Sequence, residues 1–362
     1  MLKNMSSQTK NNAITYGMVI GAFIVVQIMI STGNITRLLE GLLVPLSVYI
    51  ILAVSLNLVV GIMGDLSLGH AGFMCVGAFS GAFFVALVRD TAIAGGLRFF
   101  LAIIIGALFA GLFGLLVGIP VLRLRGDYLA IVTLAFGEII MNVTNSIFVG
   151  RDGNGLHFSL RNARVLNMEP DGVMLINGPL GIIGTPRDST FLIGVILILI
   201  TVFIVTNIIN SRDGRAIMAI RDNRIAAESI GVNITKYKLL AFSVSAALAG
   251  VAGVLYAHNL ATLTATANNF GFNMSVMILV FVVLGGIGNI RGSIIAAIVL
   301  TLLPELMRGL ADFRMLMYAV VLIAMMLLNW APKVIEWREK YGLKITFTKV
   351  KAIVEEKVKG GR

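Results

Sequence analysis

The side chains that most often carry out chemistry are sparse in this sequence and form no catalytic pattern. There are three histidines, His70, His157 and His258, and one cysteine, Cys75. The histidines are far apart and lack the close spacing of metal ligands, and a single cysteine can form neither an intrachain disulfide nor a cysteine metal site. We therefore expect no metal site, and we interpret each histidine as a polar residue at a helix end or in a loop.

The sequence also lacks the patterns of an ATP-hydrolysing enzyme. The dipeptide Gly-Lys never occurs, so the chain has no Walker-type loop that could cradle phosphates. No histidine, cysteine or pair of carboxylates meets the requirements of acid–base or metal chemistry. We expect this chain to have no catalytic residues and no cofactor, and any ATP hydrolysis that drives it to belong to another chain.

Glu138 is the ionisable residue that stands out, because it lies near the middle of an apolar stretch. An ionised carboxylate inside a bilayer is costly and must face protein or water. Asn142 and Asn145 follow at i+4 and i+7, on the same helix face. Two interpretations stay open: a polar lining of a transport path or gate, or interhelical hydrogen bonds, often worth only about 1 kcal/mol each. Asn57 and Asp65 have the same two interpretations, and Asp65 could also cap the following helix.

The elements that must position these residues are membrane helices. Of the 362 residues, 58% are hydrophobic and 13% are charged, and the mean hydropathy is +0.94. A soluble domain of this length could not hide so much apolar surface, whereas lipid accommodates it. The net charge of +11 fits cytoplasmic loops and tails that collect Lys and Arg. Because no basic stretch is interleaved with aromatic residues, we do not expect a nucleic-acid partner.

Ten apolar stretches are long enough to be membrane-spanning helices. They lie at residues 14–31, 42–63, 71–88, 99–122, 128–149, 191–209, 239–258, 274–288, 292–309 and 315–331. With the amino terminus in the cytoplasm, ten spans place 20 of the 29 Lys and Arg residues on the cytoplasmic side, as the positive-inside rule expects. The predicted fold is an all-α integral membrane protein with about ten transmembrane helices and both termini cytoplasmic.

The chain divides into a polytopic membrane domain, residues 1–332, and a basic cytoplasmic tail, residues 333–362. Within the first, residues 150–190 form a hydrophilic external segment, expected to be an ordered cap, and residues 210–238 form the longest cytoplasmic loop. The sequence Gly61–Asp65 recurs loosely at 285–289, each copy between two apolar helices. Such a repeat is a weak sign of a transporter with two similar halves.

The 210–238 loop carries the most informative pattern. It is predicted to form two short helices, near 215–221 and 224–230, with Asp222 and Asn223 as caps and Gly231 as a left-handed stop. Four isoleucines give these helices apolar faces although water surrounds the loop: Ile217, Ile220, Ile225 and Ile230. Such a surface favours docking into a partner's groove; the alternative is an amphipathic helix that rests on the bilayer.

The run Ala226-Ala227-Glu228…Gly231 resembles the cytoplasmic loop by which ABC importer permeases dock on their ATPase subunits. Other blocks, in order between about residues 40 and 330, are similar to LivM-type permeases of the branched-chain amino acid family. These blocks are Leu56–Gly61, Asp65–Phe73, Arg123–Ile139, Lys238–Phe242, Ala246–Gly253 and Leu284–Gly288. As a set they are specific, and the resemblance covers most of the chain. Two features depart from the family pattern, the Arg151–Gly155 stretch and the basic tail.

The resemblance implies a permease of the type II importer architecture in the bacterial plasma (inner) membrane. Its implied partners are ABC ATPase subunits, a second, LivH-like permease and an extracytoplasmic solute-binding protein. The implied cargo is a branched-chain amino acid, with urea, a short amide or another small solute as the close alternative. An ion-coupled secondary transporter is the alternative from another class, disfavoured because coupling sites normally involve several intramembrane ionisable groups.

Three groups of site residues follow from the pattern and the resemblance together. The ATPase-coupling loop is predicted to use Arg215, Ala219, Ile220, Arg221, Asn223, Ala226, Ala227, Glu228 and Gly231. The translocation path or its gate is predicted to use Asn57, Asp65, Glu138, Asn142 and Asn145. Close helix packing is predicted at five small residues, as is usual in bilayers: Gly250, Gly253, Gly285, Gly286 and Gly288.

Overall fold

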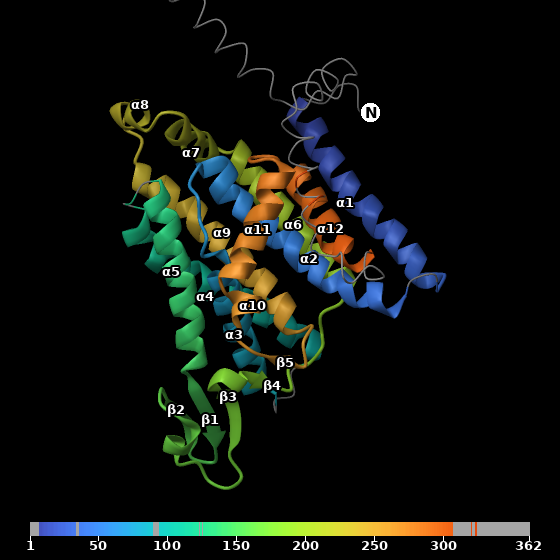
Figure 1. Cartoon of the computed structure of the whole chain (residues 1–362), viewed down its shortest axis with the longest axis vertical. Coiled ribbons are helices and arrows are strands. Elements are labelled where there is room, and N and C mark those ends of the chain that lie inside the picture. Colours follow the sequence, from blue (N-terminus) through green and yellow to red (C-terminus); the bar gives the residue numbers. More distant parts are fainter. Residues whose placement is uncertain are drawn as a thin grey trace, which may run out of the picture. The chain divides into compact units, whose positions relative to one another are not determined.

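Helices dominate the structure, a computed structural model that describes residues 7–33, 36–89, 94–122, 124, 126–306, 320 and 323 (Figure 1). Residues up to Leu302 form one compact unit, and a second unit begins at Leu303. The predicted helix at 315–331, apart from residues 320 and 323, lies outside the described residues. So do the predicted domain boundary after residue 332 and the tail.

Eight described segments are long and apolar enough to cross a membrane, and one shorter apolar helix follows them. The long helices of the first half are α1 (Ser7–Ser31), α2 (Arg37–Asn57), α3 (His70–Leu87), α4 (Gly95–Val121) and α5 (Asp127–Asn145). The second half adds α6 (Phe191–Asn210) and α9 (Ile234–Ala257), then the short α10 (Ala267–Phe270), which with α11 (Phe272–Gly285) makes up the last span, and finally α12 (Ile290–Leu306). The prediction of a multi-helix membrane protein is confirmed. Nine of the ten predicted stretches form helices in the described part of the chain.

The second predicted helix has an unexpected end. Regular helix stops at Asn57, and the last stretch is a π-helix, η2 (Leu58–Met63). Gly64 then turns the chain in the left-handed region, with φ +80°, which glycine adopts without steric cost. An irregular stretch of residues 64–69 leads to α3. π-Helical turns are rare and frequently lie at functional sites. The break between α2 and α3 is therefore a candidate for a functional element.

The interior of the first unit is formed where α9 packs against α3, α4 and α2. The contact depends on small residues, since a Cβ added to Gly250 would lie 2.6 Å from the carbonyl oxygen of Gly106 in α4. On the α3 side, a Cβ on Gly253 would overlap the carbonyl oxygen of Met74. Backbones approach this closely in membrane helix interfaces because dispersion contacts replace the hydrophobic driving force.

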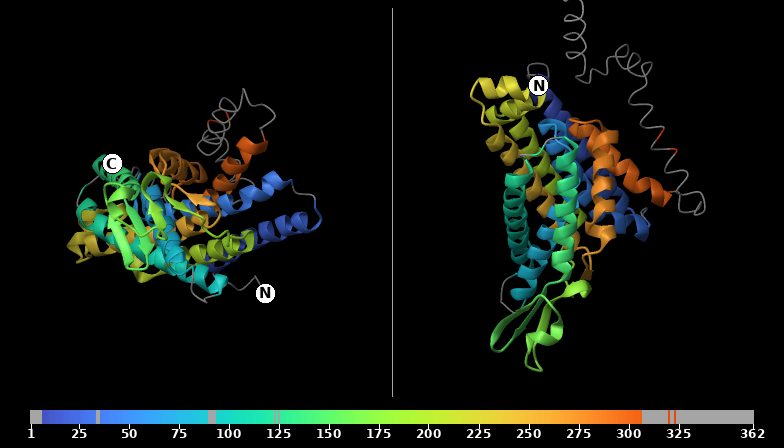
Figure 2. Two further views of the ribbon diagram at one scale, coloured as in Figure 1. Left: turned by 90° about the horizontal axis from the view of Figure 1, so that it is seen from below. Right: turned by 60° about the vertical axis from the view of Figure 1, so that its left-hand side comes forward.

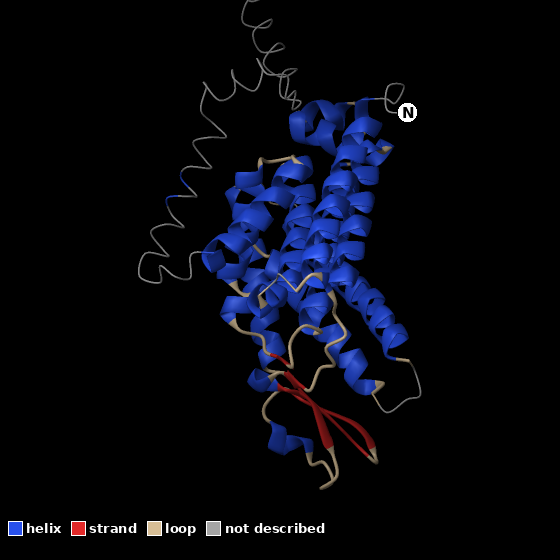
Figure 3. Ribbon diagram, turned by 90° about the vertical axis from the view of Figure 1, so that its right-hand side faces the viewer, coloured by secondary structure: helices blue, strands red, loops and turns tan. Residues whose placement is uncertain are grey.

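A small antiparallel sheet lies at one end of the helices, in red in Figure 3. It has the strand order β2-β1-β3, and its strands are β1 (Phe148–Asp152), β2 (Gly155–Ser159) and β3 (Val173–Asn177). Phe148 pairs with Ser159 on one side and with Asn177 on the other. A two-residue pair, β4 (Ile182–Ile183) with β5 (Thr262–Leu263), connects this region to the chain after α9. The prediction that the fifth helix continues to residue 149 is wrong, because the aromatic and β-branched run from Phe148 joins the sheet.

Candidate functional site

Two short helices project at the end of the bundle opposite the sheet, as the right-hand view of Figure 2 shows. They are α7 (Arg212–Asp222) and α8 (Arg224–Ser229), and together with their caps, residues 211–231, we call them the docking segment. The Ser211 hydroxyl accepts from the Gly214 amide at 3.0 Å, and Asn223 Oδ1 accepts from the Ala226 amide at 3.0 Å. Because Ser211 caps it, α7 begins three residues before the predicted start; Gly231 ends the segment with φ +86°.

The docking segment has two apolar sides that face different surroundings. Ile217 and Ile220 are buried against the body of the protein, whereas the side chains of Ile225 and Ile230 are 81% and 77% exposed. Most of the predicted coupling residues are exposed: Arg215, Ala219, Arg221, Asn223, Ala226, Glu228 and Gly231. The other two, Ile220 and Ala227, are buried. Ile225 and Ile230 belong to the apolar surface predicted for the loop, but they were not included in the predicted set of coupling residues.

The docking segment is tied to the break between α2 and α3. Arg221 Nη1 donates to the carbonyl oxygen of Gly61 at 2.9 Å, and Lys238 Nζ, in the first turns of α9, lies 2.5 Å from Asp65 Oδ2. The expectation that Asp65 caps α3 is wrong, since Gly69 precedes that helix and no side chain caps it. Lys238 was not predicted as a site residue, because its partner is 173 residues away.

Asn57 joins the two glycine-rich breaks that the sequence showed as a loose repeat. Its Oδ1 accepts from the Gly288 amide at 2.8 Å, and its Nδ2 donates to the Ser293 hydroxyl at 2.9 Å. The side chain is buried, and a Cβ on Gly61 would lie 2.6 Å from Gly288 Cα. The turn after α11 therefore rests directly on the π-helix after α2.

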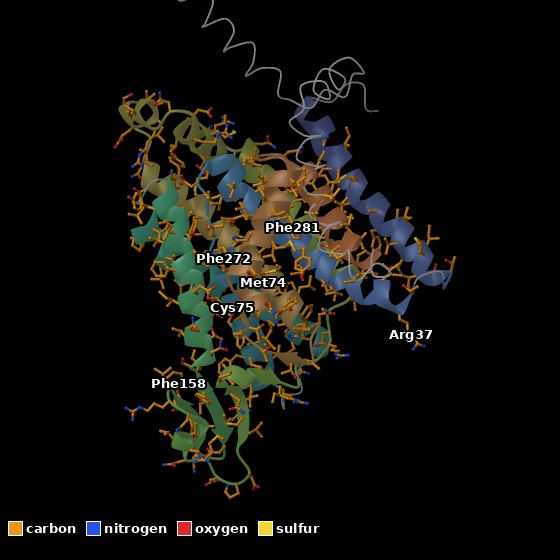
Figure 4. All side chains as sticks on the ribbon, in the orientation of Figure 1. Arg37, Met74, Cys75, Phe158, Phe272 and Phe281 are labelled. Atoms are coloured by element: carbon orange, nitrogen blue, oxygen red, sulfur yellow. The ribbon has the colours of Figure 1, made fainter. Side chains whose placement is uncertain are left out.

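The polar residues of α5 reach the connection that leads into α11. Glu138 Oε1 accepts from the amide of Phe272 at 2.7 Å. Phe272, labelled in Figure 4, is the first residue of α11. Asn145 Nδ2 donates to the Ala265 carbonyl at 2.8 Å. Asn142 is exposed, and among the described residues its side-chain amide donates to the Glu138 carbonyl, within its own helix, at 2.8 Å. Glu138 and Asn145 thus hold α5 against the chain before α11, and Asn142 remains on the outer face.

The irregular stretch before α3 packs closely on α5. The Leu68 amide donates to the Thr133 hydroxyl at 3.0 Å. A Cβ on Gly72 would lie 2.7 Å from Gly137 Cα, and one on Gly69 would overlap the Thr133 carbonyl. Position 137 precedes Glu138, so the same turn of α5 both packs on α3 and caps α11.

The predicted packing glycines occupy two different environments. Gly250 and Gly253 lie in the contacts of α9 with α4 and α3, and a Cβ on Gly285 would overlap the backbone of Gly292 in α12. Gly286 and Gly288 instead adopt φ values of +93° and +81°. Conformational freedom in the turn, more than close approach, is what requires glycine at those two positions.

Each histidine has its own local partner. His70, the first residue of α3, has its Nε2 atom 2.8 Å from the Ser55 hydroxyl of α2. His258 Nδ1 lies 3.0 Å from the Val254 carbonyl. In the three-stranded sheet, His157 Nε2 lies 2.9 Å from Asp152 Oδ2. Partial desolvation raises the pKa of Asp152, but hydrogen bonds from the Glu169 amide, His157 and the Asn154 amide outweigh it and hold this pKa below its usual value. The charged carboxylate thus organises the sheet's hairpin.

Comparison with known proteins agrees with this architecture. Residues 38–329 match the family described as "Branched-chain amino acid transport system / permease component". The Escherichia coli K12 protein named "High-affinity branched-chain amino acid transport system permease protein LivM" is 37% identical over 301 residues, which are 79% of this chain and 67% of that protein. The Salmonella typhimurium protein of the same name is 36% identical over 297 residues, with the same coverage of both chains.

More distant relatives broaden the range of named cargo. The "Fructose import permease protein FruG" of Bifidobacterium longum is 26% identical over 235 residues, covering 61% of this chain and 65% of that protein. No solved structure matches. The family match covers most of the chain, including the docking segment, both glycine-rich breaks and α5. This multi-pass membrane protein therefore belongs to the family of permease components of branched-chain amino acid transport systems.

Proposed function

We propose that this chain is the membrane permease subunit of an ATP-driven importer for branched-chain amino acids in the bacterial plasma membrane. Its family and the names of its two relatives above 35% identity support this cargo. Both termini lie in the cytoplasm, and ATP is hydrolysed by separate ABC ATPase subunits, so the chain itself is not an enzyme. Urea, a short amide or another small solute is the alternative cargo.

The exposed isoleucines of the docking segment are the observation that carries the coupling to ATP. Ile225 and Ile230 project from a segment that is itself anchored through buried Ile217 and Ile220. Exposed apolar side chains on a helical segment that is packed on its other side are what amphipathic helices insert into hydrophobic grooves. The exposed members of the predicted coupling set other than Arg221 lie in the same segment and form the ATPase contact with the exposed isoleucines, whereas Ile220 and Ala227 are buried and support it from inside.

The transport path runs along the outer face of α5, where a second, LivH-like permease completes it. Asn142 is exposed there, and Glu138 is half-buried one turn away. Asn57 and Asp65 control the inner end of the path through the glycine-rich breaks. The outer sheet is the surface that meets the solute-binding protein, because it lies at the end opposite the docking segment (Figure 1).

The test is to co-express the tagged chain with the products of its neighbouring genes and to identify what co-elutes. A pair of Walker-motif ATPases and a second permease are expected, and the binding protein is then screened against Leu, Ile, Val and urea. Preference for urea would change the cargo and leave the importer intact. If the chain eluted alone and moved solute on an ion gradient, the ATP-driven mechanism would be excluded.

A pair of variants locates the ATPase contact. Ile225→Asp is expected to abolish ATPase co-elution while the chain stays inserted, because a carboxylate cannot enter an apolar groove without a large desolvation penalty. Ile183→Asp is the matched control, since Ile183 is 65% exposed in β4, beside the outer sheet. Co-elution that survives Ile225→Asp would place the ATPase elsewhere.

A further inference from the structure

The carbonyl oxygen of Gly61 belongs to the last turn of a helix, where backbone acceptors have no partner within the helix. Arg221 supplies that partner from the docking segment, with Nη1 at 2.9 Å. A cation at this position is also favoured by the partial negative charge at a helix carboxyl end. The stem of Arg221 lies over Gly64, where any Cβ would overlap it. Arg221 is therefore seated on the break and not merely near it.

A second contact holds the same stretch from Lys238 in α9, the helix that follows the docking segment. The side chains of Lys238 and Asp65 are 10% and 16% exposed, and their charged atoms are 2.5 Å apart. Removing one member of such a pair leaves the other charge largely buried without compensation. Arg221 precedes α8 in the chain and Lys238 follows it. The two cations therefore contact residues 61–65 from both sides of α8.

The docking segment and the start of α9 share one packed cluster, so they are expected to move together. Ile220, Ala227 and Ile234 form a buried cluster, with Val232 and Tyr237 packed against it. The Val232 amide also bonds to the Ala227 carbonyl at 3.1 Å. These contacts join α7, α8 and the start of α9, so a displacement of the exposed Ile225 and Ile230 would be passed to Arg221 and Lys238.

A movement of residues 61–65 would be passed to the second glycine-rich break, at residues 285–289. Asn57, one residue before the π-helix, bonds to Gly288 and Ser293, and Gly61 lies against the Gly288 backbone. A π-helical turn is a stretch that can exchange its hydrogen-bond register with an α-helix, which makes it a suitable bistable element. The turn after α11 must follow any shift of the π-helix.

We infer that Arg221 and Lys238 are positioning residues for transport, which transmit motion of the docking segment through the Gly61 carbonyl and Asp65 to the two glycine-rich breaks. The inference rests on the proposed function, since an ATPase must supply the motion. Arg221 caps the C-terminal end of the π-helix and moves together with α7. The Lys238–Asp65 pair couples the start of α9 to the same movement.

The experiment uses the complete complex, with ATPases, partner permease and binding protein, reconstituted in liposomes. ATP hydrolysis and leucine uptake are measured together for Arg221→Gln, Arg221→Lys, Asp65→Asn and the exchange Asp65→Lys with Lys238→Asp. Arg221→Gln and Asp65→Asn are expected to keep hydrolysis but to lower uptake per ATP by about tenfold, the equivalent of one charge-assisted hydrogen bond. The charge exchange should restore part of the loss, and Lys236→Gln, at a neighbouring exposed lysine, should change nothing.

Arg221→Lys guards against a variant that fails to fold, since it keeps the charge and most of the stem. It should insert normally and still show lowered uptake per ATP. Wild-type stoichiometry in all the single variants would overturn the inference. The inference would also be overturned if the charge exchange restored the melting temperature but not the uptake per ATP. The Lys238–Asp65 pair would then stabilise the fold without transmitting motion. A wild-type complex that lacks ATPases would instead refute the proposed function.

Discussion

Helices α4 and α5 are adjacent in sequence, and each buries only a small share of its residues within the chain. Of an 18-residue window in each, 28% is buried in α4 and 33% in α5. Their outer faces are nevertheless unlike. Leu108, Leu112 and Leu116 of α4 are 66%, 51% and 57% exposed, and Arg98 near its start is the one charged residue in the helix. The outer face of α5 carries Ile131, Ile139 and Val143, 60%, 53% and 50% exposed, but it also carries the exposed Asn142 and the half-buried Glu138.

The difference shows that exposure in an isolated permease has two meanings. A continuous apolar face such as that of α4 needs no partner but lipid, because lipid tails are as apolar as leucine. A face on which Asn142 is exposed and Glu138 half-buried is costly in lipid and must meet protein or water. We therefore propose that α4 faces lipid and that α5 faces the path and the partner permease.

The largest expected effect comes from placing a charge on each outer face. Leu108→Lys puts a cation at the middle of the lipid-facing helix, where insertion costs about 2.5–3.5 kcal/mol. Ile139→Lys puts the same charge near the middle of α5, where water or protein can solvate it. The amount of chain resistant to alkaline extraction from membranes should fall on the order of tenfold or more for Leu108→Lys and much less for Ile139→Lys. Equal losses would mean that both helices face lipid.

Substitutions at the contacts that α3 makes with each of these helices should have the next largest effect and should be alike in both: Gly106 of α4 lies against Gly77 of α3, and Gly72 of α3 lies against Gly137 of α5. A Cβ on Gly106 of α4 would lie 2.9 Å from the Gly77 carbonyl, and a Cβ on Gly72 would lie 2.7 Å from Gly137 of α5. Gly106→Ala and Gly72→Ala should each destabilise the chain by about 1–3 kcal/mol through overpacking, measured by thermal unfolding in detergent. Gly96→Ala is the control, since nothing lies within 4 Å of its Cβ. Tolerance at Gly72 alone would show that α5 is loosely held.

Glu138 should give a smaller effect that separates its two interpretations. Glu138→Ala removes the acceptor of the Phe272 amide and should cost about 1–2 kcal/mol, the range for a partly exposed hydrogen bond to a charged group. Glu138→Gln keeps an acceptor oxygen and should unfold at nearly the wild-type temperature. If Glu138→Gln also transports normally, the residue serves packing; if transport falls while stability holds, its charge faces the path.

The predictable and unpredictable features of this fold separate by distance along the chain. The helices at 191–210 and 37–57, the Asn223 cap and the Gly231 stop depend on neighbouring residues, so apolar length and local hydrogen bonding determined them. The Glu138 carboxylate finds its partner 134 residues away. A sequence shows that such a carboxylate must be satisfied, but not which amide satisfies it. The π-helix has no local signature either, since it depends on contacts that Asn57 and Arg221 make across the fold.

The smallest perturbation is a thiol placed on each outer face and probed with a membrane-impermeant maleimide. The native Cys75 is fully buried, so the wild-type chain should stay unlabelled and provide the background. Asn142→Cys should be labelled in membranes because its face of α5 meets water, whereas Leu112→Cys should react only after detergent or denaturant removes the lipid. Co-expression of the second permease should protect Asn142→Cys if that subunit covers α5, and added substrate should protect it further if the path runs there. Equal labelling of both positions in intact membranes would remove the distinction between a lipid-facing α4 and a path-facing α5, and the route would then have to be sought along the glycine-rich breaks alone.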